Sequence, residues 1–355
     1  MSKGTIVVAL GGNAILQENE KGTFDEQYKH VEHTSQQLYR IWEAGYTLVV
    51  THGNGPQAGN LLIQQEEATK QVPAQTLHCV GGMTQGQIGY MFQQSLQNVF
   101  MSHGKNTPIA TIVSQVVVKE DDPDFQNPSK PVGPFYTKEQ AELLNKEKGY
   151  IVKQVKPTGD RNWRRVVPSP EPVEILEADA IKSLIKAGVI TICSGGGGIP
   201  VVKTKEGIQG IDAVIDKDKA GNVLAQTIKA DYLMILTDVE FAQINFQKPG
   251  QAKVGKVQVS QAEKYYNDGH FLKGSMGPKV LACIRFVKAG GKKAVITSLD
   301  KAVDGLKGLT GTTICPDTVF ITLTPFRSIC TESPSSRNST SPLLSSNTSS
   351  SSPSI

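Results

Sequence analysis

Cysteine is scarce in this chain and never clustered. The five cysteines lie far apart, and no two form a C-x-x-C pair: Cys79, Cys193, Cys283, Cys315 and Cys330. This spacing argues against a zinc site and a disulfide framework, and it favours a reducing compartment. The N-terminus also enters an apolar segment without the charged-then-apolar pattern of a secretion signal. We therefore expect a cytoplasmic protein.

Long apolar runs and an excess of one charge are also missing. No apolar run approaches the ~18 residues of a membrane-spanning helix. The net charge of +4 is small for 355 residues, and basic and acidic residues are interspersed. These features predict a globular protein that binds neither membranes nor nucleic acid. With 38% hydrophobic residues, the length suits one large domain or two modest ones.

The sequence does contain a repeated pattern of apolar strand, glycine turn and helix. Val31, Ser35, Leu38, Tyr39 and Trp42 share one helical face, and a glycine at position 45 follows as a C-cap. Continuous β-branched strands that alternate with helices predict an α/β fold, with a mostly parallel sheet covered on both faces. The strand-containing segments are 5–16, 46–55, 108–118, 188–198, 231–239 and 292–299.

Two segments depart from this pattern. Residues 119–172 are rich in Pro, Asp and Lys and are predicted to leave the sheet as a lid or small subdomain. Trp163, with Arg161, Arg164 and Arg165, is there expected to serve subdomain packing rather than RNA binding. In residues 328–355, thirteen of twenty-eight are serine, which predicts disorder.

Three glycine loops follow predicted strands, where ligands bind in open α/β sheets. They are Gly11-Gly12-Asn13, Gly53-Asn54-Gly55 and Gly195–Gly198, and the first matches neither G-x-x-x-x-G-K-[ST] nor G-x-G-x-x-G. Each loop alone is better explained as a tight turn. Together they indicate a site that holds a phosphate or another compact anion by backbone N–H groups.

Phosphoryl transfer also needs fixed cations. Lys217 lies between Asp216 and Asp218 after an apolar stretch predicted as a strand, although a solvated turn is the alternative. Lys279 is predicted at a helix N-terminus, where the dipole disfavours it unless it faces an anion. Lys130 lies between two prolines in the segment that leaves the sheet, and alone would be ordinary linker sequence. His52 and His78 are interpreted as structural.

A set of motifs then identifies a family. "VVALGGNAI", "THGNGPQAGN", "MTQGQIGY", "NPSKPVGPF", "WRRVVPSPEP", "CSGGGGIPVV", "AVIDKD" and "GHFLKGSMGPK", in this order, resemble the carbamate kinases of the amino acid kinase superfamily, from about Met1 to Asp317. The resemblance implies a three-layer αβα sandwich with a largely parallel central sheet, a small protruding subdomain and a homodimer. It also implies reversible phosphoryl transfer between ATP and carbamate with Mg²⁺, run towards ATP in the arginine deiminase pathway of fermentative arginine breakdown.

The resemblance also implies roles for residues. Residues 1–317 form the kinase domain, with the carbamate side in its N-terminal part, the subdomain at about 119–172 and the nucleotide side at about 188–317. The extension 318–355 is either natural or read from an altered frame. Mg²⁺ is expected mainly on nucleotide phosphates. The implied residues are Lys130, Lys217, Asp218 and Lys279 for catalysis; Gly11, Gly12, Asn13, Gly53 and Asn54 for carbamate and phosphoryl; and Gly195, Gly196, Gly197, Thr237, Asp238, Met276 and Lys279 for the nucleotide.

Two alternatives remain open. One is a related kinase acting on an acylamino acid or a nucleoside monophosphate; the "NPSKPVGPF" segment argues against it. The other is a catalytically silent regulatory protein, which would not need all of the charges at Lys130, Lys217, Asp218 and Lys279.

Overall fold

The computed structural model describes residues 2–17, 19–272 and 274–317. The predicted disorder of residues 328–355 therefore lies outside the described residues, as does the rest of the extension from residue 318. None of the helices in the described ranges combines the length and apolarity that crossing a membrane requires.

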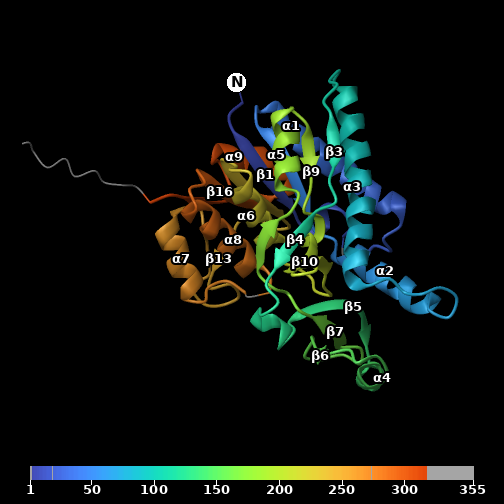
Figure 1. The fold of residues 1–355 in the computed structure, drawn as a ribbon. Coiled ribbons are helices and arrows are strands. Elements are labelled where there is room, and N and C mark those ends of the chain that lie inside the picture. Colours follow the sequence, from blue (N-terminus) through green and yellow to red (C-terminus); the bar gives the residue numbers. More distant parts are fainter. Residues whose placement is uncertain (1, 18, 273, 318–355) are drawn as a thin grey trace, which may run out of the picture. The chain divides into compact units, whose positions relative to one another are not determined.

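A large central sheet forms the middle of the domain (Figure 1). Its strand order is β15-β17-β16-β12-β1-β2-β9-β3, and every neighbouring pair is parallel except β16 and β17. The strands are apolar and β-branched, as expected for a sheet buried on both faces. Their bounds are β1 Thr5–Leu10, β2 Thr47–His52, β3 Ile109–Thr111, β9 Ile190–Ile192, β12 Tyr232–Thr237, β15 Lys256–Gln258, β16 Lys293–Ser298 and β17 Thr312–Cys315.

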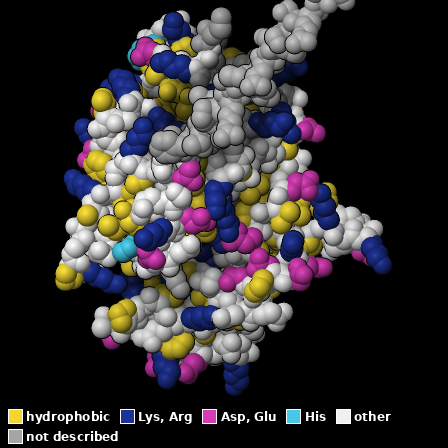
Figure 2. Space-filling model, turned by 90° about the vertical axis from the view of Figure 1, so that its left-hand side faces the viewer, with side chains coloured by type: hydrophobic (Ala, Val, Ile, Leu, Met, Phe, Trp, Pro, Cys, Tyr) yellow, Lys and Arg dark blue, Asp and Glu magenta, His cyan; other side chains and the backbone are white. Residues whose placement is uncertain are grey.

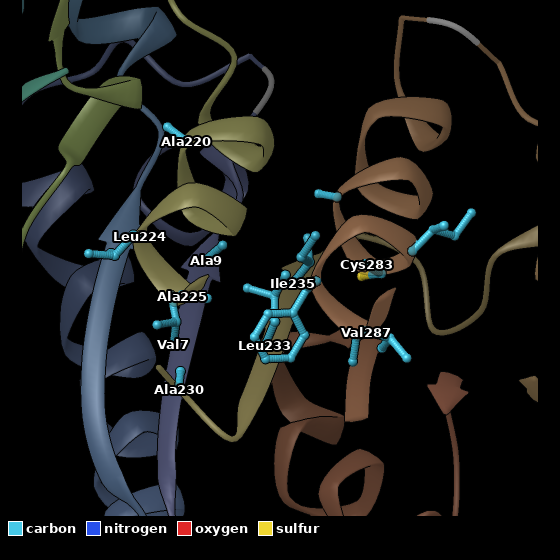
Figure 3. Close-up of a cluster of buried hydrophobic side chains, with 14 of the residues drawn as sticks. Val7, Ala9, Ala220, Leu224, Ala225, Ala230, Leu233, Ile235, Cys283 and Val287 are labelled. Carbon is cyan, nitrogen blue, oxygen red and sulfur yellow. The ribbon is translucent and has the colours of Figure 1, made fainter. Parts of the chain in front are cut away.

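Helices cover both faces of this sheet, so the predicted three-layer sandwich is confirmed. Val7 and Ala9 of β1 pack with residues of the helices on one face, as Figure 3 shows, whereas Ile6, Val8 and Leu10 pack with helices on the other. This alternation follows from the two-residue period of a strand. The first face carries α5 (Ala178–Lys186), α6 (Lys217–Thr227), α7 (Val259–Asn267) and α8 (Met276–Lys288); the second carries α1 (Phe24–Glu43), α3 (Leu77–Ser102) and α9 (Ala302–Lys307).

Helix α1 matches the predicted helical face. A capping box of Thr23 and Glu26 begins it, and Gly45 follows its end with a φ of 97°. The predicted apolar face points to the core, where Val31, Ser35, Leu38 and Tyr39 are buried and Trp42 is partly buried.

The apolar run 108–118 is not one strand, which corrects the prediction. It forms β3 of the central sheet and β4 (Gln115–Val118) of a second sheet with the order β11-β10-β4-β8. The break lies at Ser114, whose backbone N–H and C=O are both satisfied by the side-chain amide of Gln85, at 2.7 and 3.1 Å. The other strands of this sheet are β8 (Pro172–Ile175), β10 (Ile199–Thr204) and β11 (Gly207–Gly210).

The stretch before Asp216 is not a strand either. Ala213 and Ile215 are buried, but residues 211–216 join no sheet ladder, and Val214 N–H instead donates to Pro168 C=O at 2.9 Å. Burial without a ladder explains why the apolar pattern alone was misleading. The domain also contains α2 (Gly55–Ala68) and the short strands β13 (Gln243–Ile244) and β14 (Ala252–Lys253).

The proline-rich excursion forms its own small sheet, with the order β5-β7-β6 and the helix α4 beside it (Figure 1). Pro131 and Pro134 lie on β5, an edge strand, where a missing N–H is tolerated. Arg164 lies over the Phe135 ring and Arg165 over the Tyr150 ring, so this basic-aromatic patch serves packing within the subdomain. The bounds are β5 Lys130–Tyr136, α4 Lys138–Lys148, β6 Val152–Gln154 and β7 Trp163–Val167.

Candidate active site

The carboxyl ends of the central strands meet at one edge of the sheet. The register pairs Leu10 of β1 with His52 of β2 and with Leu236 of β12, so the loops that follow these strands are neighbours. Gly11 and Gly53 are the first residues of two of these loops. The glycine loops 11–13 and 53–55 are therefore brought together, as the sequence predicted.

Helix α6 begins at this edge with a charged N-terminus. The side chain of Asp216 is the N-cap, and its Oδ1 accepts hydrogen bonds from the N–H groups of Asp218 and Lys219, at 3.0 and 3.3 Å. The cap fixes the first turn of the helix. It thereby holds Lys217 and Asp218 where the strands end.

Lys217, Asp218 and Lys279 form a compact charge cluster, which we call the helix cluster. The Asp218 carboxylate accepts from Lys217 Nζ at 2.5 Å and from Lys279 Nζ, on α8, at 3.1 Å. The side chain of Asp218 is 3% exposed and each lysine side chain is 16% exposed. One buried carboxylate therefore holds two ammonium groups side by side, with their remaining N–H donors available to an anion.

Lys130 approaches the helix cluster from the subdomain and pairs with Asp216. Its Nζ lies 3.2 Å from Asp216 Oδ2, and its side chain is 37% exposed. Burial would raise the pKa of the Asp216 carboxyl, but the charges of Lys130 and Lys217 and the Asp218 N–H hold that pKa below its ordinary value. Asp216 is therefore ionised at neutral pH.

Glycine allows the close approach of these segments. A Cβ on Gly53 would lie 3.3 Å from Lys217 Cδ, and a Cβ on Gly11 would lie 3.1 Å from the carbonyl oxygen of Leu236. A Cβ on Gly12 would meet nothing within 4 Å, so its backbone faces open space. All three glycines line the cavities, and Gly11 and Gly53 in addition allow close packing.

Two cavities meet at Gly12, Lys217 and Lys279. The first, of about 560 Å³, is also lined by Gly11, Asn13, Thr237 and Asp238, and we call it the Asp238 pocket. The second, of about 670 Å³, we call the Asn54 pocket. Its further lining includes Gly53, Asn54, Lys130, Asp216 and Asp218. The helix cluster thus lies where two ligand-sized spaces join.

The glycine stretch 195–198 belongs to the Asn54 pocket. Gly196 and Gly198 line that pocket, and a Cβ on Gly196, whose φ is 68°, would lie 2.3 Å from Asn54 Nδ2. Gly195 and Gly197 are buried behind them. The structure therefore places this stretch beside Asn54, on the predicted carbamate side, and not in the pocket with Thr237 and Asp238.

The other predicted nucleotide residues lie apart from that stretch. Thr237 Oγ1 donates to Asp238 Oδ1 at 2.8 Å, and both residues line the Asp238 pocket with Lys279. Met276 is at the start of α8 and packs against the hydrophobic cluster on that face of the sheet. Met276 lines neither of the two pockets.

Neither predicted structural histidine is placed to act as a base. His52 is fully buried, which lowers its pKa to about 4, and its Nδ1 donates to the Gly53 carbonyl at 2.8 Å, so the ring is neutral. His78 pairs with Asp212 at the start of α3. Both contacts agree with a structural role.

Sequence reasoning missed several residues that line the site. His30, His33 and Asp300 line the Asp238 pocket, and Arg164 lines the Asn54 pocket. Thr84 accepts a hydrogen bond from Asn54 Nδ2 at 2.8 Å. The motif "MTQGQIGY" contains Thr84 and was the one signal that could have indicated a site role for it.

The carboxylates of the cluster suit lysines better than a metal ion. Both oxygens of Asp218 face lysines, and those of Asp216 face Lys130 and the helix N-terminus. The described residues contain no group of three or more His, Cys, Asp or Glu side chains that could hold a metal. The carboxylates of Asp216 and Asp218 are thus occupied by donors of the protein itself.

Known proteins are similar to this chain in sequence and fold. The model of the amino acid kinase family matches residues 4–298. A carbamate kinase from Thermococcus kodakarensis is 53% identical over 312 residues, which cover 87% of this chain and 98% of that protein. One from Giardia intestinalis is 47% identical over 320 residues, covering 89% and 100%.

A solved structure gives the same result. The carbamate kinase from Giardia lamblia bound to AMP-PNP matches with a TM-score of 0.84 at 48% identity, and the match covers 89% of this chain and 100% of that one. Sequence and fold thus agree over nearly the full length of these relatives. The chain belongs to the amino acid kinase family, within its carbamate kinase branch.

Proposed function

We propose that this protein transfers a phosphoryl group reversibly between ATP and carbamate, with ADP and carbamoyl phosphate as the other pair. The observation that carries the proposal is the helix cluster at the junction of two pockets. Two lysines on one buried carboxylate provide fixed positive charge at the point where ligands in the two pockets would meet. Carbamate oxygen is already ionised, so the reaction needs no general base, in agreement with a neutral, buried His52.

The two pockets supply different parts of the reaction. The nucleotide would enter the Asp238 pocket, beside Thr237 and Asp238, and carbamate would occupy the Asn54 pocket, beside Gly53 and Asn54. The phosphoryl group would cross at Gly12 and Asn13. Lys217 and Lys279 would neutralise it there, held by Asp218, with Lys130 added from the subdomain.

Mg²⁺ is proposed as the metal of the nucleotide substrate. When bound, it neutralises charge on the phosphates during transfer. The carboxylates of Asp216 and Asp218 already accept hydrogen bonds from lysines and from a helix N-terminus, so they do not compete with the phosphates for the metal ion.

We also propose a homodimer formed through α3. This helix of 26 residues contains no Asp, Glu, Lys or Arg, yet it exposes Met83, Tyr90 and Met101. Elsewhere, basic and acidic side chains are interspersed, as on the face in Figure 2. Interface cores are depleted of charge and enriched in aromatic residues and Met, so a second copy of the same face suits α3. Sedimentation should give a dimer, and Tyr90→Arg should shift it towards monomer.

The cellular setting is proposed from the family resemblance alone. In that setting the enzyme is cytoplasmic and makes ATP from carbamoyl phosphate and ADP in the arginine deiminase pathway.

A panel of phosphoryl acceptors tests the proposal. With ATP and Mg²⁺, ammonium bicarbonate, which supplies carbamate, should give ADP at a rate far above the rates with N-acetylglutamate or UMP. A higher rate with either of those would favour a related amino acid or nucleotide kinase. ADP formation with none of the three would support the silent regulatory alternative.

A further inference from the structure

One carboxylate links the subdomain to the helix that carries Lys217. Asp216 divides its two oxygens: Oδ1 caps α6 through the N–H groups of Asp218 and Lys219, and Oδ2 accepts from Lys130 Nζ at 3.2 Å. Its side chain is 17% exposed. The same residue therefore contacts both the fixed and the protruding part of the site.

Lys130 needs such a partner more than Lys217 or Lys279 does. It begins β5, an edge strand of the subdomain, and its side chain is 37% exposed, against 16% for each of the other two. A long, half-exposed lysine side chain has many accessible rotamers, and confining it to one costs conformational entropy. A fixed carboxylate in the wall of the Asn54 pocket provides that confinement before any ligand binds.

We propose that Asp216 is a positioning residue that aims the Lys130 ammonium at the phosphoryl group during transfer. The inference rests on the proposed function and adds to it a role for Asp216 that is exerted through Lys130. Lys130 has three N–H donors, so it can keep Asp216 as a partner while a second donor contacts an anion in the Asn54 pocket. Asp216 thus preorganises a charge that the subdomain alone would leave mobile.

The competing explanation is that Asp216 only caps α6. The two explanations separate because Asn and Ser cap helices about as well as Asp, whereas neither carries the charge that holds Lys130. Asp216→Asn also keeps the shape of the side chain. Asp212→Asn is the matched control, because Asp212 accepts from backbone N–H groups at the start of α3 and lines neither pocket.

We expect Asp216→Asn and Asp216→Ser to lower kcat for ATP formation about 10-fold, with the KM for carbamoyl phosphate changed less than about three-fold and the melting temperature unchanged. In a Lys130→Met background, Asp216→Asn should have almost no further effect. Asp212→Asn should behave as wild type. Wild-type kcat in both Asp216 variants, or an equal loss in the Lys130→Met background, would overturn the proposal.

A labelling measurement tests the same contact without turnover. Acetylation of Lys130 by acetic anhydride, followed by peptide mass spectrometry on the full chain, should be several-fold faster in Asp216→Asn than in wild type, because an ion-paired amine reacts slowly. An unchanged rate would overturn the proposal. If wild type makes no ATP, the proposed function fails, and labelling still decides whether Asp216 holds Lys130.

Discussion

The helix cluster and Lys130 supply cations to the same site by different means. Lys217 and Lys279 come from helices packed on the central sheet and share a carboxylate that is 3% exposed. Lys130 comes from a proline-containing edge strand and is 37% exposed. It pairs with Asp216, the N-cap residue of α6. The first arrangement fixes its charges through the core of the domain, whereas the second depends on one ion pair.

This difference suggests a division of labour. Charges that must be in place throughout the reaction are built on packed helices, where little reorganisation is possible. The charge on the subdomain, that of Lys130, is held by Asp216 instead.

Removing a lysine of the helix cluster should have the largest effect. Lys217→Ala is expected to lower kcat about 10³-fold, because the charge is needed most in the transition state. Lys219→Ala is the matched control: Lys219 is also on α6, but it pairs with Glu171 and lines neither pocket. Steady-state kinetics should separate the two variants, and equal activities would contradict the account.

Removing Lys130 should have a smaller effect. We expect Lys130→Ala to lower kcat/KM about 100-fold, since the helix cluster remains. Lys138→Ala, at an exposed position of the subdomain, should keep wild-type rates. A loss for Lys130→Ala as large as that for Lys217→Ala would contradict the proposed difference in role between Lys130 and the helix cluster.

Acid should destabilise the folded domain through His52. Its pKa is lowered from an ordinary 6.5 to about 4 by burial, so the unfolded chain binds a proton that the folded chain excludes. The stabilisation is fully present above pH 6.5 and is lost as pH falls towards 4, by about 1.4 kcal/mol per pH unit. Denaturant unfolding should show this loss in wild type.

The variant His52→Asn isolates this contribution. Asn keeps a donor for the Gly53 carbonyl but does not titrate. Its free energy of unfolding should therefore fall less steeply than that of wild type between pH 6.5 and 4, while the carboxylates act equally in both. Parallel curves would show that His52 is not the group responsible.

Removing the C-terminal extension should have the smallest effect. The relatives align over 98–100% of their own lengths while covering 87–89% of this chain. A chain that ends at Asp317 is therefore expected to keep wild-type kcat and melting temperature. A clear loss of either would show that the extension supports the domain.

Local patterns predicted the elements well where sequence and burial agree. The β-branched runs of β1, β2, β12 and β16 and the apolar face of α1 could all be identified, because each buries side chains with its own period. The run 108–118 failed for a non-local reason. Its break at Ser114 is stabilised by Gln85 on α3, 29 residues earlier in the chain.

The site was less predictable than the fold. Asp216, Lys217 and Asp218 are adjacent in sequence, so their clustering could be inferred from the chain alone. Lys279 and Lys130 were candidates from their local sequence, but only the family resemblance implied that they meet at one site, because residue spacing does not show which separate elements converge. The same limit explains the glycine stretch 195–198, whose neighbour Asn54 lies far away in the sequence.

We expect the helix cluster to stabilise a phosphoryl group during its transfer between carbamate and a nucleotide. Phosphorus NMR of wild-type protein with carbamoyl phosphate, ADP and Mg²⁺ tests it directly. The account predicts that the carbamoyl phosphate signal decreases as the γ-phosphate signal of ATP grows, and that Lys217→Ala nearly abolishes this exchange. Decay of carbamoyl phosphate to inorganic phosphate alone, with no ATP formed, would contradict it.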